Sequence, residues 1–239
     1  PNDLDKINEI VEKKERELNI KVKIIEDGAH SFGSKYKGNF IGNHGNFTMF
    51  SLQAIKHITS IDGGLLVCPD KYQYERGKLI RWYGIDRDGE RKDFRCEEDI
   101  LEWGFKFHMN DVCATVGIEN LNHYSEIVTK HIDNANFYDK NLKNSDRVTL
   151  LQREQGFESA FWIYSLLVED RDEFYKYMDS CGITVSQVHA RNDKHTCVKE
   201  FSSDLPKLEK TIDKVVSIPV GWWVSNDERE YIVECINKW

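Results

Sequence analysis

Helical and strand-like patterns of apolar residues alternate along the whole chain. In the helical stretches, apolar residues recur three and four positions apart, as on a helix with one buried face. The first of these stretches follows Asn2 and Asp3, either of which can cap a helix. Short β-branched or continuous apolar runs predict buried strands between the helices. The predicted helices are about 4–18, 69–82, 110–121, 126–142, 171–180 and 226–239, the last capped by Asn226 or Asp227, and the predicted strands are 22–25, 47–51, 65–68, 160–168, part of 182–188 and 215–218.

This alternation favours an α/β architecture with a mostly parallel sheet. The polar segment 143–147 interrupts it, so we place a domain boundary near residue 145, with 1–145 as one domain and 146–239 as a smaller α/β domain. The chain opens on a helix that feeds strand 22–25, although a parallel sheet needs several covered strands. The pattern therefore predicts either that this strand pairs with later strands or that the protein begins upstream.

Composition narrows the classes of function. An apolar fraction of 40% with 12% aromatic residues can fill a core. The formal net charge is −8, and basic residues are interleaved with acidic ones, which argues against binding to nucleic acid. The sequence contains no apolar run of about 18 residues, so it predicts no membrane span. Its six cysteines include no CxxC pair, which favours reduced, structural thiols and a cytoplasmic protein.

The candidate chemistry gathers around Lys56. Asp27 follows the first predicted strand, Ser51 stands five residues before Lys56, and Asp62-Gly63-Gly64 comes shortly after it. In α/β folds, ligand contacts gather where strands end at their carboxyl termini. This order supplies what pyridoxal phosphate needs, namely a carboxylate for the pyridinium nitrogen, a hydroxyl for the phosphate and an amine for a Schiff base. His30 stands three residues after Asp27 and could contact the ring or its phenolic oxygen.

Each of these residues, taken alone, has a structural explanation. An aspartate at the end of a strand usually serves a turn or a cap, and a lone serine or lysine carries little information. An Asp-Gly-Gly sequence alone is a turn into the next strand. The combination favours a cofactor site because chance rarely supplies all of these groups in this order.

With these elements the chain resembles the DegT/DnrJ/EryC1/StrS family of sugar aminotransferases, which have fold type I. The family's "EDxAH", "FSF" and "GDGG" elements correspond to residues 26–30, 50–52 and 61–64. The resemblance extends over nearly the whole chain. Further matches are Tyr36-Lys37-Gly38 with Gly42, the "GxKxxM" element at 104–109, Gly182-Ile183 and Ile218-Pro219-Val220.

The resemblance implies a role for each matching residue. Lys56 would be the Schiff-base lysine, Asp27 the partner of the pyridinium nitrogen, His30 a ring contact and Ser51 a phosphate contact. Lys106 would reach the phosphate in the neighbouring subunit's site, which implies a homodimer. Residues 1–145 would form the C-terminal portion of the large cofactor-binding domain. The substrates would be a nucleotide-linked keto-sugar and an amino-acid donor, with glutamate expected.

The same resemblance points to candidate substrate contacts. His108 stands where many members have arginine, and His189, Arg191 and His195 would border the sugar-nucleotide pocket. From the residues alone, the segment with His189, Asp193 and His195 is a weak metal-site candidate, because the partners that orient metal ligands cannot be seen in a sequence. We expect no metal.

Two alternative functions stay open. Related sugar dehydratases use the same cofactor but have histidine at the lysine position, so Lys56, followed by His57, favours transamination. Full-length members also carry a further N-terminal part, with a phosphate-binding loop and an aromatic residue that stacks on the ring. The chain is therefore expected to be N-terminally truncated, and an inactive folded fragment or dimerising remnant is the second alternative.

Overall fold

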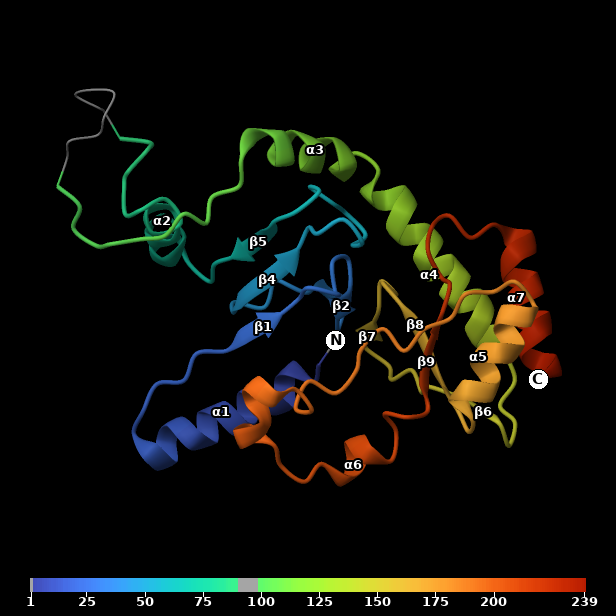
Figure 1. The fold of residues 1–239 in the computed structure, drawn as a ribbon. Helices are drawn as coiled ribbons and strands as arrows, with labels where there is room; N and C mark the ends of the chain where they lie inside the picture. The colour runs from blue at the N-terminus through green and yellow to red at the C-terminus, as the bar shows by residue number, and fades with distance from the viewer. Residues whose placement is uncertain (1, 90–98) are drawn as a thin grey trace. The chain divides into compact units, whose positions relative to one another are not determined.

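The chain divides into two compact units in the computed structural model, which describes residues 2–89 and 99–239 (Figure 1). Unit 1 comprises Pro1–Tyr124 and Gly156–Ser159, and unit 2 comprises Ser125–Gln155 and Ala160–Trp239. The division falls at residue 124 rather than near residue 145. The reason is the helix α4 (Tyr124–Asn141), whose fully buried Ala135 and Tyr138 belong to the core of unit 2.

The central sheet of unit 1 has the strand order β1-β4-β5 (Figure 1). Its strands are β1 (Ile25–Asp27), β4 (Phe47–Ser51) and β5 (Gly64–Val67). β1 runs parallel to β4, whereas β5 runs antiparallel to it. A parallel neighbour needs a long crossover connection, and the chain instead reverses direction in the short segment between β4 and β5. The expectation of a mostly parallel sheet therefore holds for one of these two pairings.

The predictions for these strands differ in accuracy. Strand 47–51 is confirmed as β4, and strand 65–68 is confirmed with its start at Gly64. The prediction of a buried strand at 22–25 is wrong, because β1 begins at Ile25 and this residue is 68% exposed. β1 is an edge strand, and its pairing with β4 begins only at Ile25.

A second, antiparallel sheet and the helices α1, α2 and α3 belong to the described part of unit 1. The sheet has the order β3-β2-β7, formed by β3 (Asn39–Phe40), β2 (Lys35–Tyr36) and β7 (Phe157–Glu158). α1 (Leu4–Leu18) is capped by Asp3, which also accepts a hydrogen bond of 3.0 Å from the Tyr36 hydroxyl. This bond docks α1 on β2. α2 (Lys71–Ile80) and α3 (Asp111–Leu121) begin after their caps, Asp70 and Asn110.

Unit 2 is an antiparallel sheet packed against helices (Figure 1). The sheet has the order β6-β8-β9, formed by β6 (Val148–Leu150), β8 (Tyr164–Val168) and β9 (Val215–Ile218). Buried side chains of α4, α5 (Arg171–Ser180) and α7 (Asn226–Lys238) share one core with β8 and β9. The short elements η1 (Thr196–Phe201) and α6 (Pro206–Glu209) lie in the connection to β9. In the described ranges of the chain, no helix is long and apolar enough to cross a membrane.

Three predictions in unit 2 need correction. Strand 160–168 begins only at Tyr164, because Phe161 has a φ of 51°, which interrupts extended backbone. Segment 182–188 contributes an isolated bridge from Ser186 to Ser217 rather than a strand. The cap of α7 is Ser225, not Asn226 or Asp227, since Ser225 and Glu228 form a reciprocal capping box.

Asn134 of α4 provides a test of the unit 2 core. Its side chain is fully buried, and its Nδ2 donates to the carbonyl oxygens of Val220, Gly221 and Val224 at 3.2, 3.0 and 3.3 Å. Asn134→Ala leaves these buried carbonyls without that donor, so we expect the free energy of unfolding to fall by roughly 1–3 kcal/mol. Chemical denaturation measures it. Asn141→Ala, which removes an exposed amide, should change it far less, and equal losses would contradict this role of Asn134.

Candidate active site

Asp27 ends β1 at the carboxyl end of the parallel pair β1–β4. The chain leaves the strand close to β4, because the Gly28 amide donates to the Met49 carbonyl at 2.8 Å. A Cβ at position 28 would lie 2.8 Å from that same carbonyl oxygen, so glycine is required here. The exposed Asp27 carboxylate accepts the Ala29 amide hydrogen at 3.0 Å. This turn fixes the carboxylate at the position where α/β folds bind ligands.

Lys56 lies in a closed loop, residues 52–63, between β4 and β5. The Leu52 carbonyl accepts hydrogen bonds from the Ser60 amide at 2.9 Å and the Thr59 hydroxyl at 3.2 Å. The Leu52 amide donates to the Gly63 carbonyl at 2.9 Å. These bonds tie the two ends of the Lys56 loop together, so the loop presents Lys56 from a fixed base.

The amine of Lys56 is half-buried near the Asp27 carboxylate. Burial lowers the pKa of Lys56, and the negative charge of Asp27 acts in the opposite direction. An amine acts as a nucleophile only when it is neutral, so a lowered pKa suits covalent chemistry with an aldehyde. The structure therefore brings together two residues that the sequence places 29 positions apart.

Ser51 ends β4 and faces Gly64 across the β4–β5 pair. Its hydroxyl oxygen accepts the Gln53 amide hydrogen at 3.3 Å, and its own proton is available to a phosphate. A Cβ at position 64 would lie 2.6 Å from the Phe50 carbonyl oxygen, so the opposing strand must approach without a side chain there. A carboxylate, a hydroxyl and an amine of lowered pKa form a donor set that fits pyridoxal phosphate.

His30 follows the Gly28 turn and is exposed. The Ser31 amide donates to the Gly28 carbonyl at 2.9 Å, which holds this segment beside the end of β1. The contact of His30 with a cofactor ring stays a prediction.

Lys106 and His108 lie beside Trp82. Lys106 is exposed and forms an isolated backbone bridge with Trp82. The centroid of the His108 ring is 3.4 Å from that of Trp82, and the Arg87 guanidinium carbon is 3.8 Å from the Trp82 ring centroid. Burial lowers the pKa of His108, and the charges of Lys106 and Arg87 lower it further. His108 is therefore packed against Trp82, and its contact with a substrate stays a prediction.

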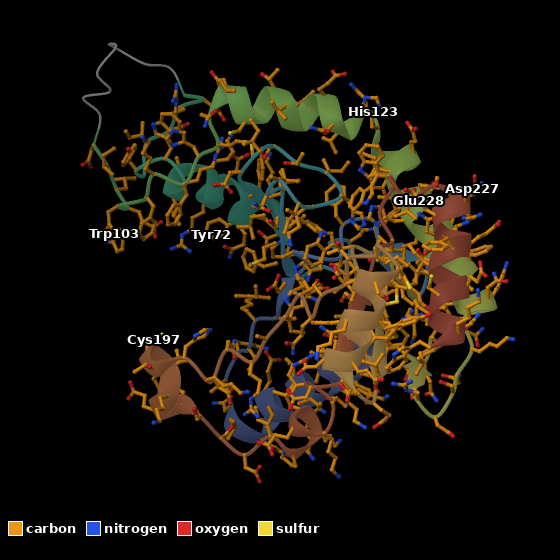
Figure 2. The ribbon with its side chains drawn as sticks, turned by 45° about the vertical axis from the view of Figure 1, so that its right-hand side comes forward. Tyr72, Trp103, His123, Cys197, Asp227 and Glu228 are labelled. Atoms are coloured by element: carbon orange, nitrogen blue, oxygen red, sulfur yellow. The ribbon has the colours of Figure 1, made fainter. Side chains whose placement is uncertain are left out.

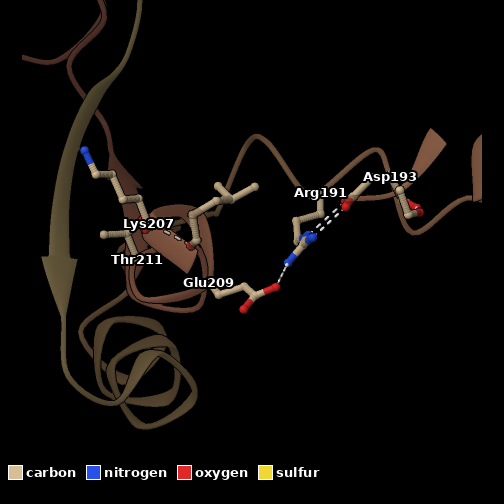
Figure 3. A network of polar contacts seen from close by, with 7 residues as sticks. Arg191, Asp193, Lys207, Glu209 and Thr211 are labelled. Atoms are coloured by element: carbon tan, nitrogen blue, oxygen red, sulfur yellow. Dashed lines mark hydrogen bonds and ion pairs between the residues drawn. The ribbon is translucent and has the colours of Figure 1, made fainter. Parts of the chain in front are cut away.

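The three candidate substrate residues of unit 2 have different environments. Arg191 donates to Asp193 at 2.8 and 2.5 Å and to Glu209 at 3.2 Å (Figure 3). The hydrogen bond to Asp193, above all, raises the pKa of Arg191. His189 is exposed, with its ring centroid 6.1 Å from that of Trp162, and His195 is exposed before η1. Within the parts of the chain that the structure covers, no three potential metal ligands gather.

Sequence reasoning missed the residues that support the Lys56 loop. Thr59 and Ser60 bond back to Leu52, and Ser60 is fully buried. Asn120 of α3 donates from its side chain to the Thr59 carbonyl at 3.1 Å. The two hydroxyl residues that follow Lys56, Thr59 and Ser60, were the signal in the sequence that could have revealed this support. The partner on α3 is 61 residues away, and no local pattern reveals such a contact.

Comparisons with known proteins show the family of this chain. A model of the DegT/DnrJ/EryC1/StrS aminotransferase family matches residues 1–237. The crystal structure of AtS13 from Actinomadura melliaura has a TM-score of 0.95 and 42% sequence identity, covering 100% of this chain and 64% of that chain. GDP-perosamine synthase of Escherichia coli O157:H7 is 27% identical over 100% of this chain and 62% of its own length. UDP-4-amino-4-deoxy-L-arabinose–oxoglutarate aminotransferase of Shewanella sediminis is 25% identical over 99% of this chain and 64% of its own length.

The fold and these matches define a fold type I protein of the pyridoxal-phosphate-dependent class. The chain belongs to the DegT/DnrJ/EryC1/StrS aminotransferase family. It spans 62% of the length of GDP-perosamine synthase and 64% of the length of AtS13.

The pairing of Lys56 with Asp27 can be tested without any substrate. Asp27→Asn removes the charge that raises the Lys56 pKa, so more of the amine should be neutral at a given pH below that pKa. We expect Lys56 to react faster with acetic anhydride in this variant, as measured by mass spectrometry of its peptide. Glu26→Gln removes a neighbouring carboxylate, which Asn46 contacts at 2.9 Å, and should leave the rate unchanged. An equal rise in both variants would contradict the pairing.

Proposed function

We propose that the protein is a pyridoxal-phosphate-dependent aminotransferase that transfers an amino group to the keto group of a nucleotide-linked sugar. The observation that carries this proposal is the half-buried Lys56, whose pKa is lowered by burial, while the charge of Asp27 acts in the opposite direction. Such a product would serve the synthesis of deoxyamino sugars or cell-surface polysaccharides. We place the reaction in the cytoplasm, consistent with the free cysteines of the described chain.

Each residue of the site has a separate task in this proposal. The bound cofactor supplies an electron sink for the substrate carbanion. Lys56 would hold the cofactor and would move a proton to or from the substrate carbon. Asp27 keeps the ring nitrogen protonated, because a carboxylate favours the cationic form of its partner. Ser51 donates its hydroxyl proton to the phosphate, and His30 contacts the ring.

The names of the relatives support the substrate class. GDP-perosamine synthase and a UDP-sugar aminotransferase both carry a nucleotide-linked amino sugar in their names. The second name includes oxoglutarate, the keto acid that glutamate becomes when it loses its amino group, which favours glutamate as the donor. Of the candidate substrate contacts, His189 and His195 are exposed, whereas a substrate anion would compete with Asp193 and Glu209 for Arg191.

A dehydratase that uses the same cofactor is the alternative enzyme. Its chemistry removes a hydroxyl group without a net transfer of an amine. Lys56 favours transamination, because the related dehydratases have histidine at that position. Isotope-labelled glutamate distinguishes the two, since only transamination moves the labelled nitrogen into the sugar.

We further propose that the working enzyme is a homodimer, with Lys106 serving the site of the partner subunit. The segment around Lys106 exposes aromatic surface, with Trp103 at 76% and Phe107 at 74%, and Figure 2 shows Trp103 pointing away from the ribbon. The rings of Phe105 and Phe107 stack with their centroids 4.8 Å apart. Exposed aromatic patches are typical of protein interfaces, and a second copy would bury this one.

The role of Lys56 predicts the outcome of covalent trapping. Protein mixed with pyridoxal phosphate and reduced with borohydride should carry the cofactor on the peptide of Lys56, and Lys56→Ala should remove this label. Lys71→Ala, which removes an exposed lysine at the start of α2, should keep it. Peptide mapping by mass spectrometry measures the label. If the Lys56→Ala variant carried as much label as the unaltered protein, on another lysine, the result would contradict the proposal.

The shared site predicts complementation between two inactive variants. In a mixed dimer of Lys56→Ala and Lys106→Ala subunits, one of the two sites would combine an intact Lys56 with an intact Lys106. We therefore expect the mixed dimer, purified through two different tags, to regain aminotransferase activity that neither parent shows. If both lysines served the same subunit's site, the mixed dimer would stay inactive.

A further inference from the structure

The Lys56 loop changes from exposed to buried at Lys56 itself. Residues 53–55 are exposed, whereas His57 and Ile58, which follow Lys56 directly, are 6% and 1% exposed. Lys56 is therefore the last residue before a packed stretch of the loop, residues 57–60. Whatever holds this packed stretch also fixes the backbone from which the Lys56 side chain extends.

Asn120 of α3 holds the packed stretch through its side-chain amide. Its Nδ2 donates to the Thr59 carbonyl at 3.1 Å and to the Val116 carbonyl of its own helix at 3.0 Å. The bond within the helix fixes the direction of the amide group. Asn120 is half-buried, so its bond to Thr59 is partly shielded from water. α3 thereby fixes the backbone shortly after Lys56.

α3 approaches the packed stretch closely because position 117 is a glycine. A Cβ at Gly117 would lie 3.1 Å from the Cβ of Ser60, which is fully buried. Gly117 and Asn120 are three residues apart and lie on the same face of the helix. Just before α3, the Cε of Met109 would lie 2.6 Å from a Cβ at Gly63, at the far end of the loop. α3 and the residue before its cap therefore contact the loop from the packed stretch to its end.

α3 buries little besides this contact in the part of the chain that the structure describes. Gly117 is its buried residue, and Val112 and Ile118 are 69% and 66% exposed. The described hydrophobic core clusters contain no residue of α3. A helix that only supported a core would bury an apolar face. The structure therefore favours a role for α3 at the Lys56 loop.

We propose that Asn120 is a positioning residue for Lys56, through which α3 holds the Lys56 loop where the amine can reach a bound pyridoxal phosphate. This inference rests on the proposed function. Asn120 would act through the Thr59 carbonyl rather than by contact with the cofactor. Such support matters because a misplacement of about 1 Å can slow a reaction about a hundredfold.

The proposal predicts a change in the pH at which Lys56 reacts. Burial, the larger of two effects, lowers the pKa of Lys56, and the charge of Asp27 acts against it. In Asn120→Ala the loop loses its amide support, so Lys56 should become more exposed and its pKa should return toward the ordinary lysine value. We therefore expect the midpoint of the pH profile for acetylation of Lys56 by acetic anhydride to move to higher pH. Mass spectrometry of the Lys56 peptide measures this profile without any cofactor.

Covalent trapping measures the same positioning toward the cofactor. The protein is mixed with pyridoxal phosphate and reduced with borohydride after increasing times, and the label on the Lys56 peptide is followed. We expect labelling to be roughly tenfold slower in Asn120→Ala, because the amine is no longer held in one place. Asn122→Ala is the matched control, since it removes an exposed amide at the end of the same helix, which contacts Glu119 at 3.3 Å. This control should change neither the pH midpoint nor the labelling rate.

The two measurements separate this inference from the proposed function. An unchanged pH midpoint in Asn120→Ala, or an equal change in Asn122→Ala, would overturn the positioning role. If the unaltered protein takes no label on Lys56, the proposed function fails. The acetylation profile needs no cofactor, so it still decides whether Asn120 positions Lys56.

Gly117→Ala keeps the proposal testable if Asn120→Ala folds poorly. Alanine favours a helix more than glycine does, so this change should not destabilise α3 itself. Its new Cβ, 3.1 Å from that of Ser60, forces the packed stretch to shift by a few tenths of an ångström. We expect slower labelling of Lys56 in a variant whose helical content, measured by circular dichroism, is unchanged. Labelling at the rate of the unaltered protein would count against the proposal.

Discussion

The conflict between burial and charge at Lys56 is the interaction on which the candidate site depends. Burial favours the neutral amine, while the Asp27 carboxylate favours the cation. A fully exposed lysine would remain protonated, and a lysine locked in a tight ion pair would be unavailable for covalent chemistry. Half-burial lowers the pKa of the amine, and the charge of the carboxylate limits that shift. The turn after β1 and the hydrogen bonds that close the Lys56 loop hold these two groups in place.

Two features of the backbone hold Asp27 and Lys56 in position. The parallel pairing of β1 and β4 places Asp27 at the strand end, and Gly28 lets the chain follow β4 closely. The Lys56 loop is closed on itself through Leu52, with Thr59 and Ser60 as its inner supports. Ser51 enters the loop directly from β4, so the hydroxyl and the amine share one rigid base. This is how a fold with a small sheet can position three different chemical groups.

Much of the fold and of the candidate site was predictable from the local sequence pattern, and the errors in these predictions have physical causes. Caps, turns and helical spacing located α3 and α5, and the order of Asp27, Ser51 and Lys56 predicted the proposed cofactor site. The extent of β1 was wrong because an edge strand can expose apolar residues such as Ile25. The start of β8 was wrong because propensity does not reveal the left-handed backbone of Phe161. The partners Asn120 and Trp82 were missed because they depend on tertiary contacts far apart in sequence.

The central claim is that Lys56 and Asp27 form one cofactor site, and a crystal structure of the protein with pyridoxal phosphate tests it most directly. We expect continuous electron density between the cofactor and the Lys56 side chain, with the ring nitrogen against the Asp27 carboxylate. The phosphate should lie near Ser51. Density for the cofactor on another lysine, or a ring nitrogen turned away from Asp27, would contradict this account.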